Sequence, residues 1–177
     1  FNNYDDSNSR RLPGEDADGI SISTGDSNVV YRAMTYYNSD DGIDAWQSTN
    51  TLIDGVVSFN NGRGSNGDGN GIKAGGPADN YTIVQNTVTF NNRAAGFTAN
   101  GGRYSSFYNN TSFNDSTHAF MTNSTSTLRN NLAVGPTNYL QGADSRNNSW
   151  DLGISDPRFI SQNPDDPAFL SLRSDSA

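Results

Sequence analysis

The chain is 177 residues long, which suits a single domain, and its composition is acidic, with a formal net charge of -8 and no cysteine. The acidic balance without a basic stripe disfavours nucleic acid as a partner, and no apolar run approaches the roughly 20 residues of a membrane span. The lack of cysteine excludes disulfides and zinc–thiolate sites. Abundant Asn, Ser, Thr, Asp and Gly disfavour helices. Because the sequence starts at Phe1 without a methionine or a signal peptide, we read it as a processed product or a fragment.

A degenerate repeat begins within the first twenty residues and recurs along the chain. In its first part a Gly or Ala precedes a bulky apolar residue. The Gly or Ala lies at positions 19, 42, 71, 96 and 119, so the steps are 23, 29, 25 and 23 residues. An extended second part follows each copy, over residues 30–38, 52–61, 81–92 and 105–114, with a weaker copy over 127–135. Short strands at this period, separated by Gly and Asn turns, predict a parallel β-helix of roughly six or seven coils.

Equivalent positions of successive coils form columns, because stacked strands lie about 4.8 Å apart. One column is predicted to point inward and to form the core: Ile20, Ile43, Ile72, Phe97 and Phe120. The Asn residues at the strand ends are expected to form side-chain ladders between coils and to adopt the left-handed conformation of tight turns. A leucine-rich repeat is the main alternative, but leucine is scarce and no helical half-repeat is visible.

The remaining segments depart from the repeat. The 29-residue step contains the glycine-rich residues 62–69, which we expect to bulge from one turn as a loop. We expect one β-helix domain over 1–177, with regular coils over about 15–136 and an irregular turn over about 137–177 that covers the C-terminal end. No cap is visible at the N-terminal end. We expect a monomer unless upstream coils or another chain cover that end.

Acidic residues gather next to the only lysine of the chain. If the neighbouring Ile residues point inward, Asp44 and Lys73 point outward from adjacent coils. Asp40 and Asp41 enter the strand of Asp44, and Asp18 lies in the column of Asp41. Four carboxylates without His or Cys suit a hard cation such as Ca²⁺. The alternative is a set of ordinary Asp-Gly turns, with Lys73 in a structural ion pair with Asp44 rather than acting as a base.

Three segments carry a family resemblance. They are Ala-Asp-Gly at 17–19, Asn-Ser-Asp-Asp-Gly-Ile-Asp-Ala-Trp at 38–46 and Gly-Asn-Gly-Ile-Lys-Ala-Gly-Gly at 69–76. With these motifs the chain resembles the pectate lyases of polysaccharide lyase family nine over about residues 15–135. The resemblance implies a right-handed β-helix, Lys73 as the catalytic base, and calcium ligands at Asp18, Asp40, Asp41 and Asp44. Asp16 competes with Asp18 as the first ligand, and column stacking favours Asp18. Relatives in this family carry several coils before this stretch.

The implied function is that of a secreted, Ca²⁺-dependent lyase that cleaves polygalacturonate by β-elimination. Calcium would neutralise the uronate carboxylate, and neutral Lys73 would remove the proton from C5. Arg63, Arg93 and Arg103 are nearest in register to Lys73 and are predicted to bind substrate carboxylates. One alternative is a lyase of another polyuronate such as alginate. The other is a non-catalytic β-helical module, such as an adhesin, a fibre or a carbohydrate-binding segment.

Overall fold

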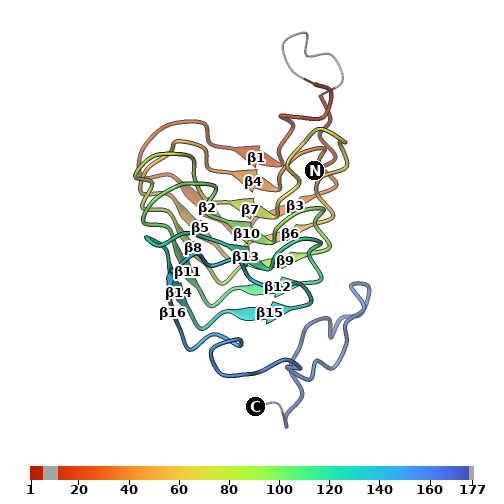
Figure 1. Ribbon diagram of the computed structural model, residues 1–177. Coiled ribbons are helices and arrows are strands. Elements are labelled where there is room, and N and C mark those ends of the chain that lie inside the picture. Colours follow the sequence, from red (N-terminus) through yellow and green to blue (C-terminus); the bar gives the residue numbers. More distant parts are fainter. Residues whose placement is uncertain (6–11, 176–177) are drawn as a thin grey trace.

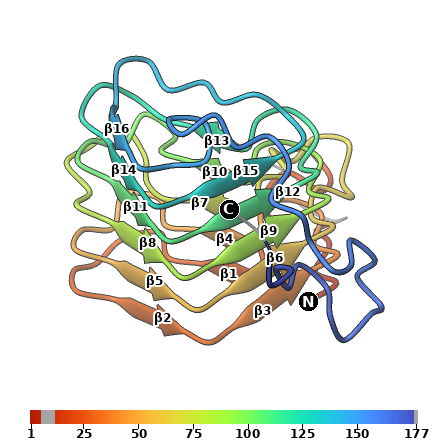
Figure 2. The ribbon, with the colours of Figure 1, turned by 90° about the horizontal axis from the view of Figure 1, so that it is seen from below.

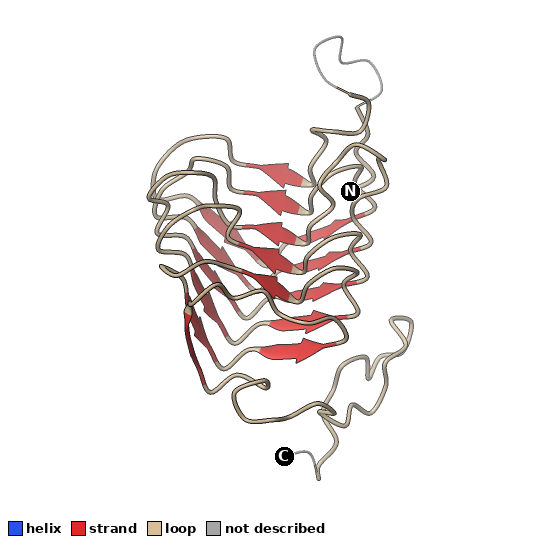
Figure 3. Cartoon of the chain, in the orientation of Figure 1, coloured by secondary structure: helices blue, strands red, loops and turns tan. Residues whose placement is uncertain are grey.

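The computed structural model describes residues 1–5 and 12–175, and every regular element in this part of the chain is a strand (Figure 3). The strands form three parallel sheets that run side by side along the molecule (Figure 1). The first sheet contains β1 (Ile20–Ser21), β4 (Ile43–Asp44), β7 (Ile72–Lys73), β10 (Phe97–Thr98) and β13 (Phe120–Met121). The second contains β2 (Val29–Tyr31), β5 (Leu52–Asp54), β8 (Ile83–Gln85), β11 (Ser106–Tyr108), β14 (Thr127–Arg129) and β16 (Asp144–Arg146). The third contains β3 (Met34–Tyr36), β6 (Val57–Phe59), β9 (Val88–Phe90), β12 (Thr111–Phe113) and β15 (Leu132–Val134).

The predicted parallel β-helix is confirmed. Five successive coils contribute one strand to each sheet in turn, and β16 adds a sixth strand to the second sheet, so the described residues form five full coils and part of a sixth, against the predicted six or seven. Seen along the stack, the three sheets enclose a common interior (Figure 2). No helix in the described residues has the length and apolar character that crossing a membrane requires.

The predicted core column is present in the first sheet. The strands pair in the register Ile20, Ile43, Ile72, Phe97 and Phe120. The last four of these side chains are fully buried, and the rings of Phe97 and Phe120 stack with their centroids 4.8 Å apart. Apolar residues of the second sheet, among them Ile53, Phe107 and Leu128, complete this core. The alternation of strands therefore sends the next residue of each pair, Asp44 and Lys73 among them, to the outer face.

The turns after the third sheet divide the expected roles of asparagine between two adjacent positions. The first position adopts the left-handed conformation, with φ angles of 53° at Asn60, 55° at Asn91 and 55° at Asn114. Asparagine tolerates this conformation better than most residues. The first position therefore makes the turn, and the ladder forms at the residue that follows.

The ladder at the second position runs through the buried side chains of Asn38, Asn61, Asn92 and Asp115. The side-chain Oδ1 of Asn61 accepts hydrogen bonds from the backbone N and the Nδ2 of Asn38, and Oδ1 of Asn92 accepts the same pair from Asn61. Asp115 Oδ1 ends the row by accepting both donors of Asn92. The ladder satisfies polar groups that the coils would otherwise bury without partners.

The C-terminal part leaves the repeat in stages. β16 still pairs with β14, so the second sheet continues beyond residue 136, and Trp150 then packs against Phe120. The following segment returns along the third sheet, where the ring of Phe169 contacts Phe90 and Phe113 edge-on. This segment therefore covers part of the outer face of the third sheet. The predicted boundary near residue 136, between the regular coils and the irregular C-terminal turn, stays a prediction.

Candidate functional site

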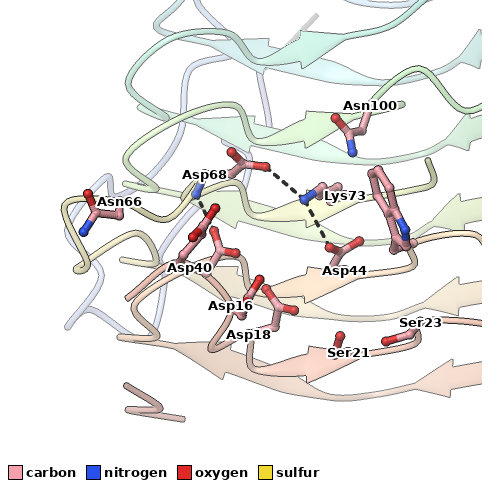
Figure 4. A pocket seen from close by; sticks show the side chains of 12 residues that line it. Asp16, Asp18, Ser21, Ser23, Asp40, Asp44, Asn66, Asp68, Lys73 and Asn100 are labelled. Atoms are coloured by element: carbon pink, nitrogen blue, oxygen red, sulfur yellow. Dashed lines mark hydrogen bonds and ion pairs between the residues drawn. The ribbon is translucent and has the colours of Figure 1, made fainter. Parts of the chain in front are cut away.

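A polar cavity of about 600 Å³ lies on the outer face of the first sheet, between its N-terminal coils and the loop of residues 62–69. Figure 4 shows the side chains that line it. The lining residues are Glu15, Asp16, Asp18, Ser21, Ser23, Asp40, Asp44, Trp46, Asn66, Asp68, Lys73 and Asn100. Six of them are acidic and one is basic, so the cavity carries a strong negative charge that a bound cation would offset.

Lys73 lies at the centre of this acidic surface. Parallel pairing of β4 with β7 sets Asp44 opposite Lys73, as the repeat predicts. The Nζ atom of Lys73 is 3.1 Å from Asp44 Oδ2, 3.3 Å from Asp41 Oδ2 and 2.9 Å from Asp68 Oδ2. The ring of Trp46 lies on another side of the amine, with its centroid 5.6 Å from Nζ. Only 9% of the lysine side chain is exposed, so the amine is held in one place.

Three aspartates form a compact cluster beside the lysine. Oxygen atoms of Asp18, Asp40 and Asp41 all lie within 4.8 Å of one another. Asp18 and Asp41 occupy one column, and Asp18 Oδ1 accepts a hydrogen bond of 3.1 Å from the backbone N of Asp41. Asp44 lies outside this cluster and contacts Lys73. Asp16, the competing candidate, lines the cavity but is likewise outside the cluster.

The chain orients the cluster with its own backbone donors. Asp41 Oδ1 accepts from the N and the Nδ2 of Asn70, at 2.6 and 3.0 Å. Asp40 Oδ1 accepts from the backbone N of Asp68 and, at 3.3 Å, from that of Gly69. These donors belong to residues 68–70, which directly precede β7. The segment that carries the lysine therefore also fixes two of the carboxylates.

Among the four proposed calcium ligands, two carboxylate oxygens are buried without a hydrogen bond, namely Asp41 Oδ2 and Asp44 Oδ1. Asp41 Oδ2 has only the ion pair with Lys73. A buried oxygen anion without a donor is costly unless a proton or a cation balances it. These orphan oxygens, in an all-oxygen donor set without His or Cys, suit a hard divalent cation such as Ca²⁺.

The pKa values of the clustered aspartates are raised, which indicates that the site has too little positive charge to balance its carboxylates. Burial, reinforced by repulsion from Asp41, raises the pKa of Asp18 to about 8. Burial and the neighbouring Asp40 raise the pKa of Asp41 to about 7, and burial raises that of Asp40 to about 6. Burial lowers the pKa of Lys73, but Asp41 and Asp44 outweigh it and raise that pKa above the ordinary lysine value. Without a further cation, the site therefore holds its protons on these groups.

The three predicted substrate-binding arginines do not line this cavity. Arg63 lies near the start of the 62–69 loop. Its Nη1 donates to Asn2 Oδ1 at 2.7 Å, and its guanidinium lies over the ring of Tyr37. Arg103 Nη2 forms an ion pair of 2.5 Å with Asp79. The prediction placed these residues near Lys73 from their positions in the repeat, whereas in the structure their side chains contact other protein groups.

Arg93 has partners within the protein. Its Nη1 and Nη2 atoms donate to the backbone carbonyl oxygens of Gly64 and Gly67. Both carbonyls belong to the 62–69 loop, so the guanidinium is used within the protein. The contact of Arg93 with substrate stays a prediction.

Asp68 is the site residue that the sequence reasoning missed. It lies in the 62–69 loop, outside the repeat register, and its carboxylate is nevertheless the one closest to Lys73 Nζ. The signal that could have found it is its spacing of five residues before the lysine, with glycines on both sides that allow the loop to fold back.

Comparisons with known proteins agree on a family. The family described as Pel9A-like, right-handed β-helix region, matches residues 1–148. Pectate lyase L of Paenibacillus polymyxa is 36% identical over 115 residues, which cover 56% of this chain and 26% of that protein. Pectate lyase PEL9 of Emericella nidulans is 30% identical over 190 residues, which cover 84% of this chain and 46% of that protein. The crystal structure of pectate lyase Pel9A superposes with a TM-score of 0.80 at 25% identity, over 92% of this chain and 48% of that one.

The family match spans well over half of the chain, so the chain belongs to the Pel9A-like β-helix family. This confirms the resemblance to the pectate lyases of family nine and the right-handed helix that it implied. The chain spans less than half the length of these matched proteins.

Proposed function

We propose that this member of the Pel9A-like family is a calcium-dependent pectate lyase that cleaves polygalacturonate-type chains by β-elimination. The observation that carries the proposal is the position of Lys73, whose amine is 3.1 Å from Asp44 and 3.3 Å from Asp41 at the edge of an all-aspartate cluster. This elimination needs a base and a cation site, and a buried lysine next to carboxylate oxygens supplies both. The pectate lyase names of the relatives support the same substrate class.

Asp18, Asp40, Asp41 and Asp44 would hold the cation through carboxylate oxygens. Bound there, Ca²⁺ would neutralise a substrate carboxylate and so acidify the C5 proton that lies α to it. The fit rests on the three clustered carboxylates and on the orphan oxygens of Asp41 and Asp44. The remaining chemistry falls to the side chains of the chain itself.

Lys73 is the base in this proposal. Its neutral Nζ takes the proton from C5, the released electron pair forms the C4–C5 double bond, and the glycosidic oxygen leaves C4. Asp41 and Asp44 hold a proton on the amine as long as their charge is uncompensated. The base therefore becomes available only when the charge of the cluster is neutralised. A lysine can lose its proton in this way, whereas an arginine cannot.

Trp46 provides a wall for a sugar ring next to the base. Its side chain is 36% exposed, lines the cavity and lies against Lys73. The apolar faces of sugar rings stack on indole, and this contact needs no positive charge. We infer that, without an arginine in the cavity, orientation of the substrate depends on Trp46 together with the cation.

A polymeric substrate cannot enter cells, so we also propose that the protein acts outside the cell. We further propose that the described coils form one domain that acts as a monomer. The monomer prediction holds unless another chain covers the first coil.

The test is the ultraviolet absorbance of the unsaturated uronate product. We expect the absorbance to rise when the protein meets polygalacturonate with Ca²⁺, and to stop rising when EDTA is added. The same assay on alginate distinguishes a lyase of another polyuronate. Binding of either polymer without turnover would instead support a non-catalytic β-helical module.

A further inference from the structure

The loop of residues 62–69 is held against the β-helix by backbone hydrogen bonds, such as those from the N–H groups of Arg63 and Gly64 to the neighbouring coil, and by the side chain of Arg93. Both terminal nitrogens of Arg93, on the next coil, donate to loop carbonyls, at Gly64 and Gly67. The planar guanidinium has a fixed fork of donors, so it can bind two acceptors at once. Between these two glycines, Asn66 Nδ2 donates to the carbonyl oxygen of Pro13 at 2.8 Å. The loop is therefore held from two sides.

The fastened loop delivers two kinds of contact to the candidate site. Its backbone N–H groups at Asp68 and Gly69 donate to Asp40 Oδ1. The side chain of Asp68 contacts Lys73, with Oδ2 2.9 Å from Nζ. Figure 4 shows Asp68 reaching the lysine from the side opposite to Asp44. The first contact orients a member of the aspartate cluster, and the second acts on the amine.

The three carboxylates around the amine differ in exposure. The side chains of Asp41 and Asp44 are 0% and 12% exposed, whereas that of Asp68 is 58% exposed. An ammonium has three donors, and three acceptors on different sides fix its position. The two shielded acceptors, Asp41 and Asp44, belong to the coil that precedes the coil of the lysine, and the exposed acceptor, Asp68, belongs to the loop. Without Asp68, the amine would relax toward Asp41 and Asp44.

We propose that Asp68 is a positioning residue that holds the Lys73 amine at the cavity, and that Arg93 acts through the loop to keep Asp68 and the loop amides in place. The part of the proposal that involves turnover rests on the proposed function. The part that involves the attachment of the loop does not depend on any activity. It assigns to Arg93 a role inside the protein instead of a contact with substrate.

The first experiment compares Asp68→Ala and Asp68→Asn with Ser65→Ala, a control at an exposed residue of the same loop. A misplaced catalytic group can cost about 10²-fold, so Asp68→Ala is expected to lower kcat by about that factor with KM nearly unchanged. Asp68→Asn keeps an oxygen acceptor and should recover part of the loss. An unchanged kcat in Asp68→Ala, or a rise in KM alone, would overturn the role of Asp68.

The second experiment uses Arg93→Ala and Arg93→Lys and needs no turnover. Loss of the fork should release the loop, so proteolysis within residues 62–69 should become faster in both variants without calcium, whereas Asp68→Ala should resemble the wild type. Calcium affinity, measured by calorimetry, should fall about 10–100-fold in Arg93→Ala, as for other residues that orient ligands. Wild-type proteolysis and affinity in Arg93→Ala would show that Arg93 does not fasten the loop.

The two experiments separate the failure of this proposal from failure of the proposed function. A wild-type protein without turnover on any polyuronate would contradict the proposed function and the role of Asp68 in it. The proteolysis and calorimetry of the Arg93 variants would still decide whether the loop is fastened as the contacts indicate.

Discussion

Asp44 and Lys73 are paired residues of adjacent strands, and their side chains meet on the outer face of the first sheet with 3.1 Å between Oδ2 and Nζ. Parallel stacking makes this contact unavoidable, because both residues follow a buried isoleucine of the same column. The pair is an ion pair between adjacent coils, and it also joins the candidate base to one of the four proposed calcium ligands. Substitutions that preserve one role and remove the other can separate the two.

The substitution Lys73→Arg keeps the positive charge beside Asp41 and Asp44 but removes a side chain that can lose its proton. We expect the fold and the calcium affinity to persist and turnover of polygalacturonate to fall by about 10²–10⁴-fold, the usual effect of losing a proton-transfer group. Initial rates of product absorbance measure the change, and calorimetry with Ca²⁺ is the control. Retention of more than about a tenth of the wild-type rate would exclude Lys73 as the base.

The substitution Asp41→Asn removes a fully buried carboxylate that has one orphan oxygen. We expect calcium affinity to fall at least about tenfold, because a charged ligand is replaced by a neutral one. In EDTA the variant should be no less stable than the wild type, because burial and the neighbouring Asp40 disfavour the charged form of Asp41. Calorimetry and thermal unfolding test both parts, with the exposed Asp165→Asn as the matched control. Wild-type affinity in Asp41→Asn would remove Asp41 from the proposed ligands.

The columns of the β-helix could be predicted from the sequence because the repeat imposes them. Once the Gly or Ala positions are aligned, the register sets Asp18 beneath Asp41 and Asp44 beside Lys73, and the structure has both contacts. The core column follows from the same alignment. Each of these relationships is a backbone relationship, and local side-chain chemistry has little freedom to change it.

Side chains that leave the register could not be predicted in the same way. Asp68 belongs to an inserted loop whose carbonyl oxygens contact the guanidinium of Arg93, a residue on another coil. Arg93 itself was expected to face substrate because its position in the repeat is near Lys73. Its actual partners are backbone carbonyl oxygens, which every sequence contains and which therefore leave no signature. The same argument explains why the ladder at Asn61 could not be distinguished from the turn at Asn60.

The substitution Asn92→Ala should test the ladder that ties the coils together. The side chain of Asn92 accepts from the backbone N of Asn61 at 3.1 Å and donates to the carbonyl oxygen of Ser58 at 3.0 Å, in a fully buried position. Its loss leaves these groups unpaired and opens a small void. We expect the free energy of unfolding to fall by about 2–4 kcal/mol. Urea denaturation measures it, with Gln162→Ala at an exposed position as the control; equal losses in both variants would contradict a special role for the ladder.

The end of the same ladder predicts a pH dependence of stability. Asp115 is buried, and this burial raises its pKa from 3.8 to about 6 in spite of hydrogen bonds from Ser112, Asn92 and Thr89. A carboxyl whose pKa is higher in the folded than in the unfolded state binds its proton more tightly when folded. Its contribution is therefore fully present below the unfolded value near 3.8 and is lost as the pH rises through about 6. The loss is on the order of 3 kcal/mol.

The substitution Asp115→Asn removes this titration while the amide oxygen can still accept from both donors of Asn92. Aspartates of the candidate site have raised pKa values as well, so stability of the wild type and of the variant should both decline as the pH rises from about 4 to about 8. The decline between about pH 4 and pH 8 should nevertheless be smaller in Asp115→Asn. Urea denaturation across this range, in EDTA, measures the difference between the two proteins. Parallel curves would mean that the ladder keeps Asp115 ionised at no cost to folding.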